Sequence, residues 1–453
     1  MRFVLLPLLL VMPLACADVL DDKIMQEMAR RHVPGLSVLV IQDGKVLKEK
    51  GYGYANLEHS VPVTEKTVFQ SGSVGKTFTA ALVMLLAEDG KLSLDDPIAR
   101  HLSNTPPAWN GITIRHLLTH TSGLGDPYKV LDFRKDYSDE ELIALEAGIP
   151  MLFAPGERYS YSNMGYHLLG FICNKAGGKF YGDQLRERIF APLGMETKVI
   201  TEEDIVPHRA AGYTWNNGVL RNQSWVAPML NTTADGSLYL TARDLAKWDQ
   251  ALYGDSILTT RMRAASWTPP KLANGDNSGY GYGWMIGELK GHRLVSHSGA
   301  WQGFKSQIDR YVDDKFTVIV LANSASAKPG KFTSMITGHF MPALAVEPAK
   351  AIPDRSPEVT VKLRAAITSL AAGEPPARMT PAVAEQFGPD MLPKYRTGLT
   401  RLGELKTVEL LSRTSVAEAI SYRYRFNFTE ESLIVIGELN KEGQLAKLRM
   451  FLD

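Results

Sequence analysis

The pattern of apolar and polar residues predicts strands near both ends of a long first segment, with helices between them. Two strand-like runs fill residues 36–57 and flank the turn pair Asp43-Gly44, a combination that favours a β-hairpin. Three more strand-like runs lie between 293 and 324. We therefore expect one sheet that is built from distant parts of the chain.

A buried helix is predicted after the hairpin. From Val74 onward, apolar residues recur at three- and four-residue spacing, and Gly90 offers a left-handed residue at which such a helix ends. Residues from about 97 to 290 then alternate short helical patterns with loops rich in proline and glycine. This middle region is predicted to be a mostly helical insertion.

The chain is long enough for two folding units. We expect a linker at 346–358, because this charged stretch carries three prolines and few apolar residues. Residues 359–453 open with a helical pattern and end with four strand-like runs, which predicts a small α+β domain with an antiparallel sheet. The larger domain is then 18–345.

Residues 1–17 have the features of a secretory signal peptide, since one positive charge precedes an apolar run and a small-x-small triplet. The run is too short to span a bilayer. We expect cleavage after Ala17 and an exported, periplasmic or extracellular protein without a transmembrane segment in the mature chain. A lipid anchor on Cys16 is the less favoured alternative, because Pro13 stands where such signals carry an aliphatic residue.

The composition narrows the classes of partner. Fifty basic and 49 acidic residues give a formal charge of +1, so nothing in the balance points to nucleic acid or to an anionic membrane surface. Hydrophobic residues at 45% and charged residues at 22% are typical of a globular chain. Two cysteines cannot build a disulfide framework, and Cys173 has apolar neighbours that suggest a buried, inert thiol.

Ser73 and Lys76 place a hydroxyl and an amine three residues apart at the start of the predicted buried helix. That spacing puts both side chains on one helix face, a turn apart. Serine needs a neighbour to accept its proton, and a lysine screened from water can be deprotonated enough to do so. The pair suits a nucleophile and its base. The alternative is a helix-start serine with an exposed lysine, since Ser-x-x-Lys is common.

The same segment also looks like the end of a nucleotide-binding P-loop, because Gly75-Lys76-Thr77 precedes an apolar helix. That interpretation fails on spacing. The P-loop needs a glycine five residues before Gly75, and the chain has Gln70 there.

Tyr161 and Asn163 lie on a loop between a turn-forming Ala-Pro-Gly and a helical pattern. Loops of this kind present side chains to a cleft. A phenol beside a cationic lysine can pass a proton to a leaving group, and an asparagine amide can orient the lysine and a substrate carbonyl. The structural alternative is a buried tyrosine with a satisfied hydroxyl beside a loop asparagine.

His297 and Gly299 end a predicted strand, and Ala300 follows them. Glycine at this place lets a ligand approach the backbone closely, although a turn histidine is the structural alternative. His116 and His120 have the four-residue spacing of metal ligands but lack the glutamate of a His-Glu-x-x-His site and a third ligand. We interpret both as structural and expect no metal.

Three weak motifs in this order are strong together: Ser73-x-x-Lys76, Tyr161-x-Asn163 and His297-x-Gly299. Their order and spacing resemble the serine β-lactamase, penicillin-binding protein and esterase superfamily, specifically its class C-like branch, over about residues 20–340. The resemblance implies an α/β fold, in which an antiparallel sheet is flanked by helices and joined by a mostly helical subdomain. It implies no metal and no organic cofactor.

The resemblance also implies roles for the motif residues. Ser73 would be the acylated nucleophile, and Lys76 and Tyr161 the proton-transfer pair. Asn163 would orient them.

Around the last motif, His297, Gly299 and Ala300 would bind substrate along a strand edge, and the backbone N–H groups of Ser73 and Ala300 would form the oxyanion hole. Efficient penicillin-hydrolysing members usually carry lysine where His297 stands. Histidine there is more similar to the esterase and peptidase members.

The leading hypothesis is therefore an exported serine hydrolase that forms an acyl-enzyme with a small-molecule or peptide substrate, either an ester or an amide, such as a D-amino-acid peptide. A β-lactamase or D-Ala-D-Ala carboxypeptidase is the alternative within the same fold. A catalytically silent protein that binds peptidoglycan or a partner is the alternative of another class. The sequence leaves the oligomeric state and the role of the small C-terminal domain open.

Overall fold

The computed structural model describes residues 19–201, 203–216, 218–236, 238–347, 349–416 and 419–452. This part of the chain forms two compact units, the first ending at Val346 and the second beginning at Glu347. The predicted signal peptide, with Cys16, lies outside the described residues.

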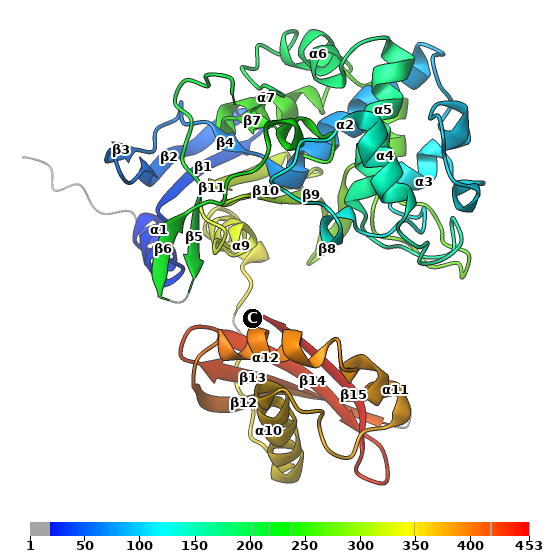
Figure 1. The fold of residues 1–453 in the computed structure, drawn as a ribbon. Coiled ribbons are helices and arrows are strands. Elements are labelled where there is room, and N and C mark those ends of the chain that lie inside the picture. Colours follow the sequence, from blue (N-terminus) through cyan, green and yellow to red (C-terminus); the bar gives the residue numbers. More distant parts are fainter. Residues whose placement is uncertain are drawn as a thin grey trace, which may run out of the picture. The chain divides into compact units, whose positions relative to one another are not determined.

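The first unit is built on a seven-stranded antiparallel sheet (Figure 1). From one edge to the other its strands are β3 (Val61–Pro62), β2 (Lys45–Asn56), β1 (Gly35–Gln42), β11 (Phe316–Ala322), β10 (Phe304–Tyr311), β9 (His292–Trp301) and β8 (Met285–Leu289). The central pair joins β1 to β11, in which partners such as Val38 and Val320 are far apart in sequence, so distant segments do form one sheet. Two short strand pairs are added, β4 (Phe69–Gln70) with β7 (Tyr239–Leu240) and β5 (Tyr213–Asn216) with β6 (Val219–Asn222).

Strand β1 shows why this sheet is covered on both faces. Side chains alternate between the faces of a strand, and here both sets are apolar. Val38 and Val40 pack in the core that α1 (Val19–Arg30) and α9 (Pro329–Phe340) cover, whereas Leu39 and Ile41 pack in the core of the opposite face. Figure 1 shows α1 and α9 below the sheet, with α2 (Lys76–Glu88) and α7 (Ala242–Ala251) above it.

The β1–β2 hairpin has the predicted turn. Asp43 and Gly44 have φ values of 49° and 77°, and the left-handed region that they occupy is the one that a tight hairpin turn needs. Helix α1 was not predicted, although Leu20, Ile24 and Met28 recur every four residues and are buried. That four-residue spacing is a helix signal in the sequence itself.

Helices dominate the region between the strands, as predicted. They are α3 (Ile114–Leu118), α4 (Asp139–Ala147), α5 (Asn163–Gly177), α6 (Tyr181–Leu185), α7 and α8 (Thr260–Ser266). The buried helix predicted after Val74 is α2, whose first eleven residues are all buried. It packs between the sheet and α5 and shares one large apolar core with both. The predicted fold class, an antiparallel sheet flanked by helices with a mostly helical subdomain, is confirmed.

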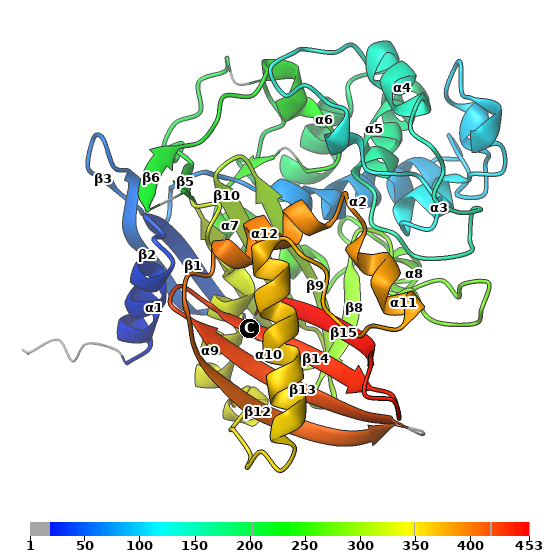
Figure 2. The same ribbon diagram turned by 60° about the horizontal axis from the view of Figure 1, so that its bottom comes forward.

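The second unit is a small α+β domain, as predicted (Figure 2). Its antiparallel strands follow chain order: β12 (Leu405–Val416), β13 (Ala419–Phe428), β14 (Ser432–Leu439) and β15 (Leu445–Leu452). Helix α10 (Pro357–Ala372) packs on this sheet through Leu363 and Ile367. Two short helices, α11 (Pro381–Ala384) and α12 (Leu392–Thr400), were not predicted. In the part of the chain that is described, no helix is both long and apolar enough to cross a membrane.

Candidate active site

Three backbone segments meet where strand β9 passes the turn that carries Ser73. A Cβ on Gly299 would lie 2.1 Å from the carbonyl oxygen of Ser71, and a Cβ on Gly72 would lie 2.4 Å from the backbone nitrogen of Ala300. A Cβ on Gly236, which belongs to a third segment, would lie 2.3 Å from the carbonyl oxygen of Gly72. Only glycine permits such approaches, so these residues bring the Ser73 turn, β9 and the segment around Gly236 together.

Lys76 is the hub of the side-chain contacts in this region. Its Nζ donates to Ser73 Oγ across 3.1 Å and to Asn163 Oδ1 across 2.8 Å, and it also donates to the carbonyl oxygen of Asp235. Ser73 lies in the 3₁₀ turn Gly72–Gly75, directly before α2 begins at Lys76. One turn of helix therefore separates the hydroxyl from the amine, as the spacing predicted.

The charge of Lys76 is disfavoured by its surroundings. The side chain is fully buried, and this burial lowers the pKa of the amine to about 8, although the carboxylates of Asp235 and Asp126 favour the charged form. The Nζ atom also lies 5.0 Å from the centroid of the Tyr161 ring. A lysine with this pKa is partly neutral near pH 7 to 8, where it can accept a proton.

Tyr161 reaches the same cluster from the loop before α5. Its hydroxyl is buried and has no hydrogen-bond partner among the described residues. Burial raises the pKa of the phenol well above its usual value, and the nearby Ser73 side chain offsets only part of that effect. Tyr161 is thus a neutral phenol at physiological pH. Its hydroxyl lies near the Ser73 side chain, where it can act on a reacting group.

The imidazole of His297 is neutral and held at both nitrogens. Its Nδ1 lies 2.6 Å from the carbonyl oxygen of Ser298, so Nδ1 carries the proton, and its Nε2 accepts from the hydroxyl of Tyr280 across 2.8 Å. Burial and the nearby Lys76 lower the pKa of His297 to about 3. The position therefore carries no fixed positive charge.

The structure brings together all the residues singled out by the three motifs, and it adds three that the sequence analysis had not placed there: His120, Asp235 and Tyr280. The His120 ring lies 4.1 Å from the ring of Tyr161, and its Nδ1 accepts from the backbone N–H of Ser162. His120 is one of the two histidines that were interpreted as structural from the sequence. No local pattern marked Asp235.

Cys173 is buried, as its apolar neighbours suggested. This burial raises the pKa of its thiol to about 12. Within the described ranges, no three His, Cys, Asp or Glu side chains are grouped so that they could hold a metal ion.

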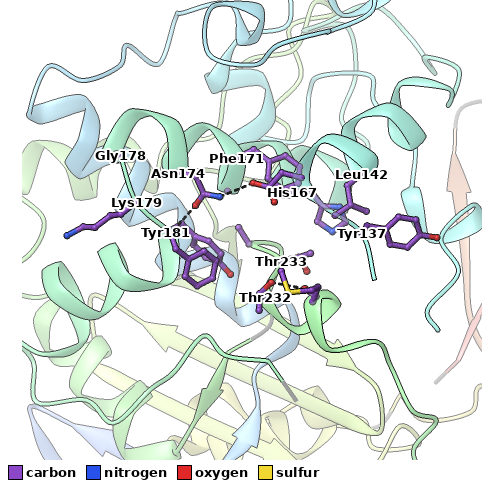
Figure 3. Close-up of a pocket in the computed structure, with 15 residues that line it drawn as sticks. Tyr137, Leu142, His167, Phe171, Asn174, Gly178, Lys179, Tyr181, Thr232 and Thr233 are labelled. Atoms are coloured by element: carbon purple, nitrogen blue, oxygen red, sulfur yellow. Dashed lines mark hydrogen bonds between the residues drawn. The ribbon is translucent and has the colours of Figure 1, made fainter. Parts of the chain in front are cut away.

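A cavity of about 420 Å³ lies beside this cluster, between helices α4, α5 and α6 and the segment that ends at Ala234 (Figure 3). Its walls include His167, Asn174 and Tyr181. Ser73 and Lys76 are not among its lining residues. The Ser73 hydroxyl, the Lys76 amine and the Tyr161 phenol lie together outside the lining of this cavity. We therefore take the Ser73–Lys76 pair, and not the cavity, as the candidate site of the chemistry.

The chain is similar to several known proteins. The Beta-lactamase family model matches residues 20–334. Penicillin-binding protein 4* from Bacillus subtilis (strain 168) is 33% identical over 318 residues, which cover 66% of this chain and 70% of that protein. Several other curated relatives are longer, and the chain spans 57 to 66% of them.

Two solved structures extend the likeness to three dimensions. The octameric penicillin-binding protein homologue from Pyrococcus abyssi has a TM-score of 0.65 and 27% identity, over 96% of this chain and 95% of that one. The D-amino acid amidase from Ochrobactrum anthropi SV3, solved with D-phenylalanine, has a TM-score of 0.62 and 26% identity, over 72% of this chain and 100% of that one.

Proposed function

The chain belongs to the β-lactamase family of serine hydrolases, and we propose that it transfers the acyl group of an ester or amide first to Ser73 and then to water. One observation carries the proposal. The Ser73 hydroxyl lies 3.1 Å from a buried lysine amine whose pKa is lowered to about 8. A serine in that position has the base that it needs to become a nucleophile.

In the first step, Ser73 Oγ attacks the substrate carbonyl carbon and gives its proton to Lys76 Nζ. A new C–O bond forms and the carbonyl oxygen becomes an oxyanion. The backbone N–H groups of Ser73 and Ala300 form the oxyanion hole in this proposal, which the 2.4 Å approach between the Gly72 Cβ position and Ala300 N supports. Tyr161 and Lys76 return the proton to the leaving alcohol or amine as its bond to carbon breaks.

In the second step, a water molecule attacks the acyl carbon and loses its proton to the same pair. Ser73 Oγ leaves with a proton, and the acid product is released. Asn163 keeps the Lys76 amine oriented through the 2.8 Å hydrogen bond in both steps.

The neutral imidazole of His297 favours substrates that carry no charge beside it. A lysine at this place would meet a substrate carboxylate with a fixed charge, but the imidazole of His297 is neutral and already bonded to Tyr280. We therefore propose substrates in which the part that lies beside β9 is uncharged. These are short esters, amides and D-amino-acid amides or peptides. The likeness to a D-amino acid amidase supports the last class. Turnover of β-lactams or of D-Ala-D-Ala peptides remains the alternative within the family.

Covalent labelling tests the proposal. A fluorophosphonate should modify the wild-type protein at one site, and peptide mass mapping should place the adduct on Ser73. The variant Ser73→Ala should not be modified, whereas Ser266→Ala, which removes a buried hydroxyl on α8 that donates to the carbonyl oxygen of Met262, serves as the matched control and should be modified like the wild type. Equal labelling of wild type and Ser73→Ala would refute the assignment.

A panel of a short acyl ester, a D-amino-acid amide, a D-Ala-D-Ala peptide and nitrocefin then ranks the substrate classes. Retention of muropeptides without turnover of any of these would instead favour a binding protein. Export by way of residues 1–17 and the division into domains at 18–345 and 359–453 remain proposals, as does any assembly through the second unit. Fractionation of cells that express the full chain tests export.

A further inference from the structure

A chain of buried ionisable groups runs from the helical subdomain to Lys76. Glu146 on α4 lies 2.6 Å from Nδ1 of His167 on α5, and Nε2 of His167 lies 3.2 Å from Oδ1 of Asp235. All three side chains are buried. The backbone carbonyl of Asp235 then accepts from Nζ of Lys76. None of these three acidic and basic groups takes part in the acyl transfer described above.

The segment that carries Asp235 is fixed on the catalytic turn by three consecutive carbonyl oxygens. Ala234 accepts from the Thr79 hydroxyl across 2.7 Å, Asp235 accepts from Lys76, and Gly236 accepts from the Ser71 hydroxyl across 2.9 Å. A displacement of Asp235 would therefore move the oxygen that holds the Lys76 amine.

The carboxylate of Asp235 also accepts hydrogen bonds from its neighbours. Tyr128 donates to Oδ2 across 2.6 Å, and the Thr233 hydroxyl donates to Oδ1 across 2.7 Å. Although burial opposes its charge, the His167 cation, Lys76 and Tyr128 hold the pKa of Asp235 well below its usual range. Burial also opposes the charge of His167, but Asp235 and Glu146 raise the pKa of that imidazole to about 10. Asp235 and His167 are thus an ion pair at neutral pH.

We propose that the Glu146–His167–Asp235 chain positions Lys76 and sets the charge that it carries, so that Asp235 and His167 are positioning residues of the acyl-transfer site. This inference rests on the proposed function, in which Lys76 accepts the proton of Ser73. His167 also lines the cavity of Figure 3, so the chain links the helical subdomain to the base.

Other groups act on Lys76 as well, and the test must separate them from the chain. The charged and titratable groups that face Lys76 from the surrounding elements are Asp235, Asp126, Ser73, Tyr161, Tyr166, His120 and His297. The two carboxylates favour its charged form. The two histidines are buried and neutral, since burial and the Lys76 charge lower the pKa of each. Among these groups, Asp235 is the residue that accepts a hydrogen bond from Lys76 and also forms an ion pair with His167.

The test measures kcat/KM against pH for a neutral ester, with the rate of fluorophosphonate labelling of Ser73 as a second readout. In the wild type, both should rise through the pKa of Lys76. Asp235→Asn keeps the shape and the acceptor oxygen but removes the charge that favours the ammonium form. Its acid limb should move to lower pH by at least about 0.5 unit, about a threefold change in the free-amine fraction below the pKa.

His167→Gln is the second variant. It removes the cation that offsets the Asp235 carboxylate, so the limb should move to higher pH. If Asp235 becomes protonated in that variant, its negative charge is lost and the limb moves to lower pH instead. A shift of the limb in either direction requires that His167 acts on Lys76. The matched control is Asp139→Asn, which removes a carboxylate on the same cavity that bonds to Asn174 instead, and its limb should stay in place.

A fall in kcat with the limb at its wild-type position in every variant that folds would overturn the inference, because a merely structural role does not move a pKa. Circular dichroism and the melting temperature establish folding for each variant, and one folded variant is sufficient to decide. A wild type without labelling at Ser73 refutes the proposed function instead, so the two failures can be told apart.

Discussion

The Tyr280 hydroxyl donates to Nε2 of His297 across 2.8 Å, and this bond leaves the imidazole without a free lone pair. The other nitrogen donates to the carbonyl oxygen of Ser298. With a pKa lowered to about 3, His297 is uncharged at every pH at which the protein is expected to work. A substrate that binds along β9, as proposed above, would meet a neutral side chain at this position.

Replacing His297 by lysine should change which substrates the protein prefers. A buried ammonium at this place would form a charge-assisted hydrogen bond with a substrate carboxylate, a type of bond that contributes about 1.5 to 3 kcal/mol. We expect His297→Lys to improve kcat/KM for a carboxylate-bearing peptide, relative to the matching amide, by about tenfold or more. His297→Gln, which is polar and uncharged, is the control. An unchanged preference would show that the carboxylate does not bind along β9.

The pH profile of the wild-type protein should show one acid limb in the neutral to alkaline range. The pKa of Lys76 is lowered to about 8, and only its neutral form can accept the Ser73 proton. Activity on a neutral ester should therefore rise as the pH increases toward about 8. Steady-state kcat/KM between pH 5 and 10 checks this. A limb centred near 6.5 would instead indicate a titrating histidine, contrary to the low pKa of His297.

The two proton-transfer residues should behave as one unit. Lys76→Ala and Tyr161→Phe should each lower kcat at least about a hundredfold, which is the low end of what a positioned acid or base contributes. Because coupled catalytic groups are far from additive, the double variant should lose little more than the worse single variant. Single-turnover kinetics should show that Lys76→Ala slows acylation most. Two losses that simply multiply would argue against a shared proton path.

The close approach at Gly299 should not tolerate a side chain. The Cβ of an alanine would lie 2.1 Å from the carbonyl oxygen of Ser71, and backbone atoms cannot move aside without shifting β9 from the Ser73 turn. We expect Gly299→Ala to lower the melting temperature and to remove most Ser73 labelling. Gly287→Ala on the neighbouring strand β8 is the matched control, since its Cβ would meet nothing within 4 Å.

A chain that ends at Val346 should keep its activity on small esters. It retains both cores of the first unit, including the buried Leu344, and every residue of the candidate site. Labelling of Ser73 and ester turnover should stay within a few fold of those of the full chain. If the shortened protein melts cooperatively yet cannot be labelled, the second unit contributes to the site and the proposed division into domains is wrong.

The parts of this protein that could be predicted from sequence are those whose physical cause is local. Ser73 and Lys76 are three residues apart at a helix start, so helical geometry alone brings the hydroxyl to the amine. The short apolar run of β1 and the turn pair Asp43-Gly44 likewise specify a strand and its hairpin within a few residues. The order of three short motifs was sufficient to indicate the family.

Tertiary structure alone decided which other groups act on that pair. Asp235 lies 159 residues from Lys76, and nothing in its neighbourhood predicts that its carbonyl would accept from the amine. The contact exists because glycine backbones pack at distances that no side chain permits, and those approaches depend on the whole sheet and helical subdomain. The charge states of Lys76 and His297 also depend on tertiary structure, because burial lowers the pKa of both groups. The sequence specifies which side chains can titrate, but burial and neighbours contributed by distant segments determine whether they are charged.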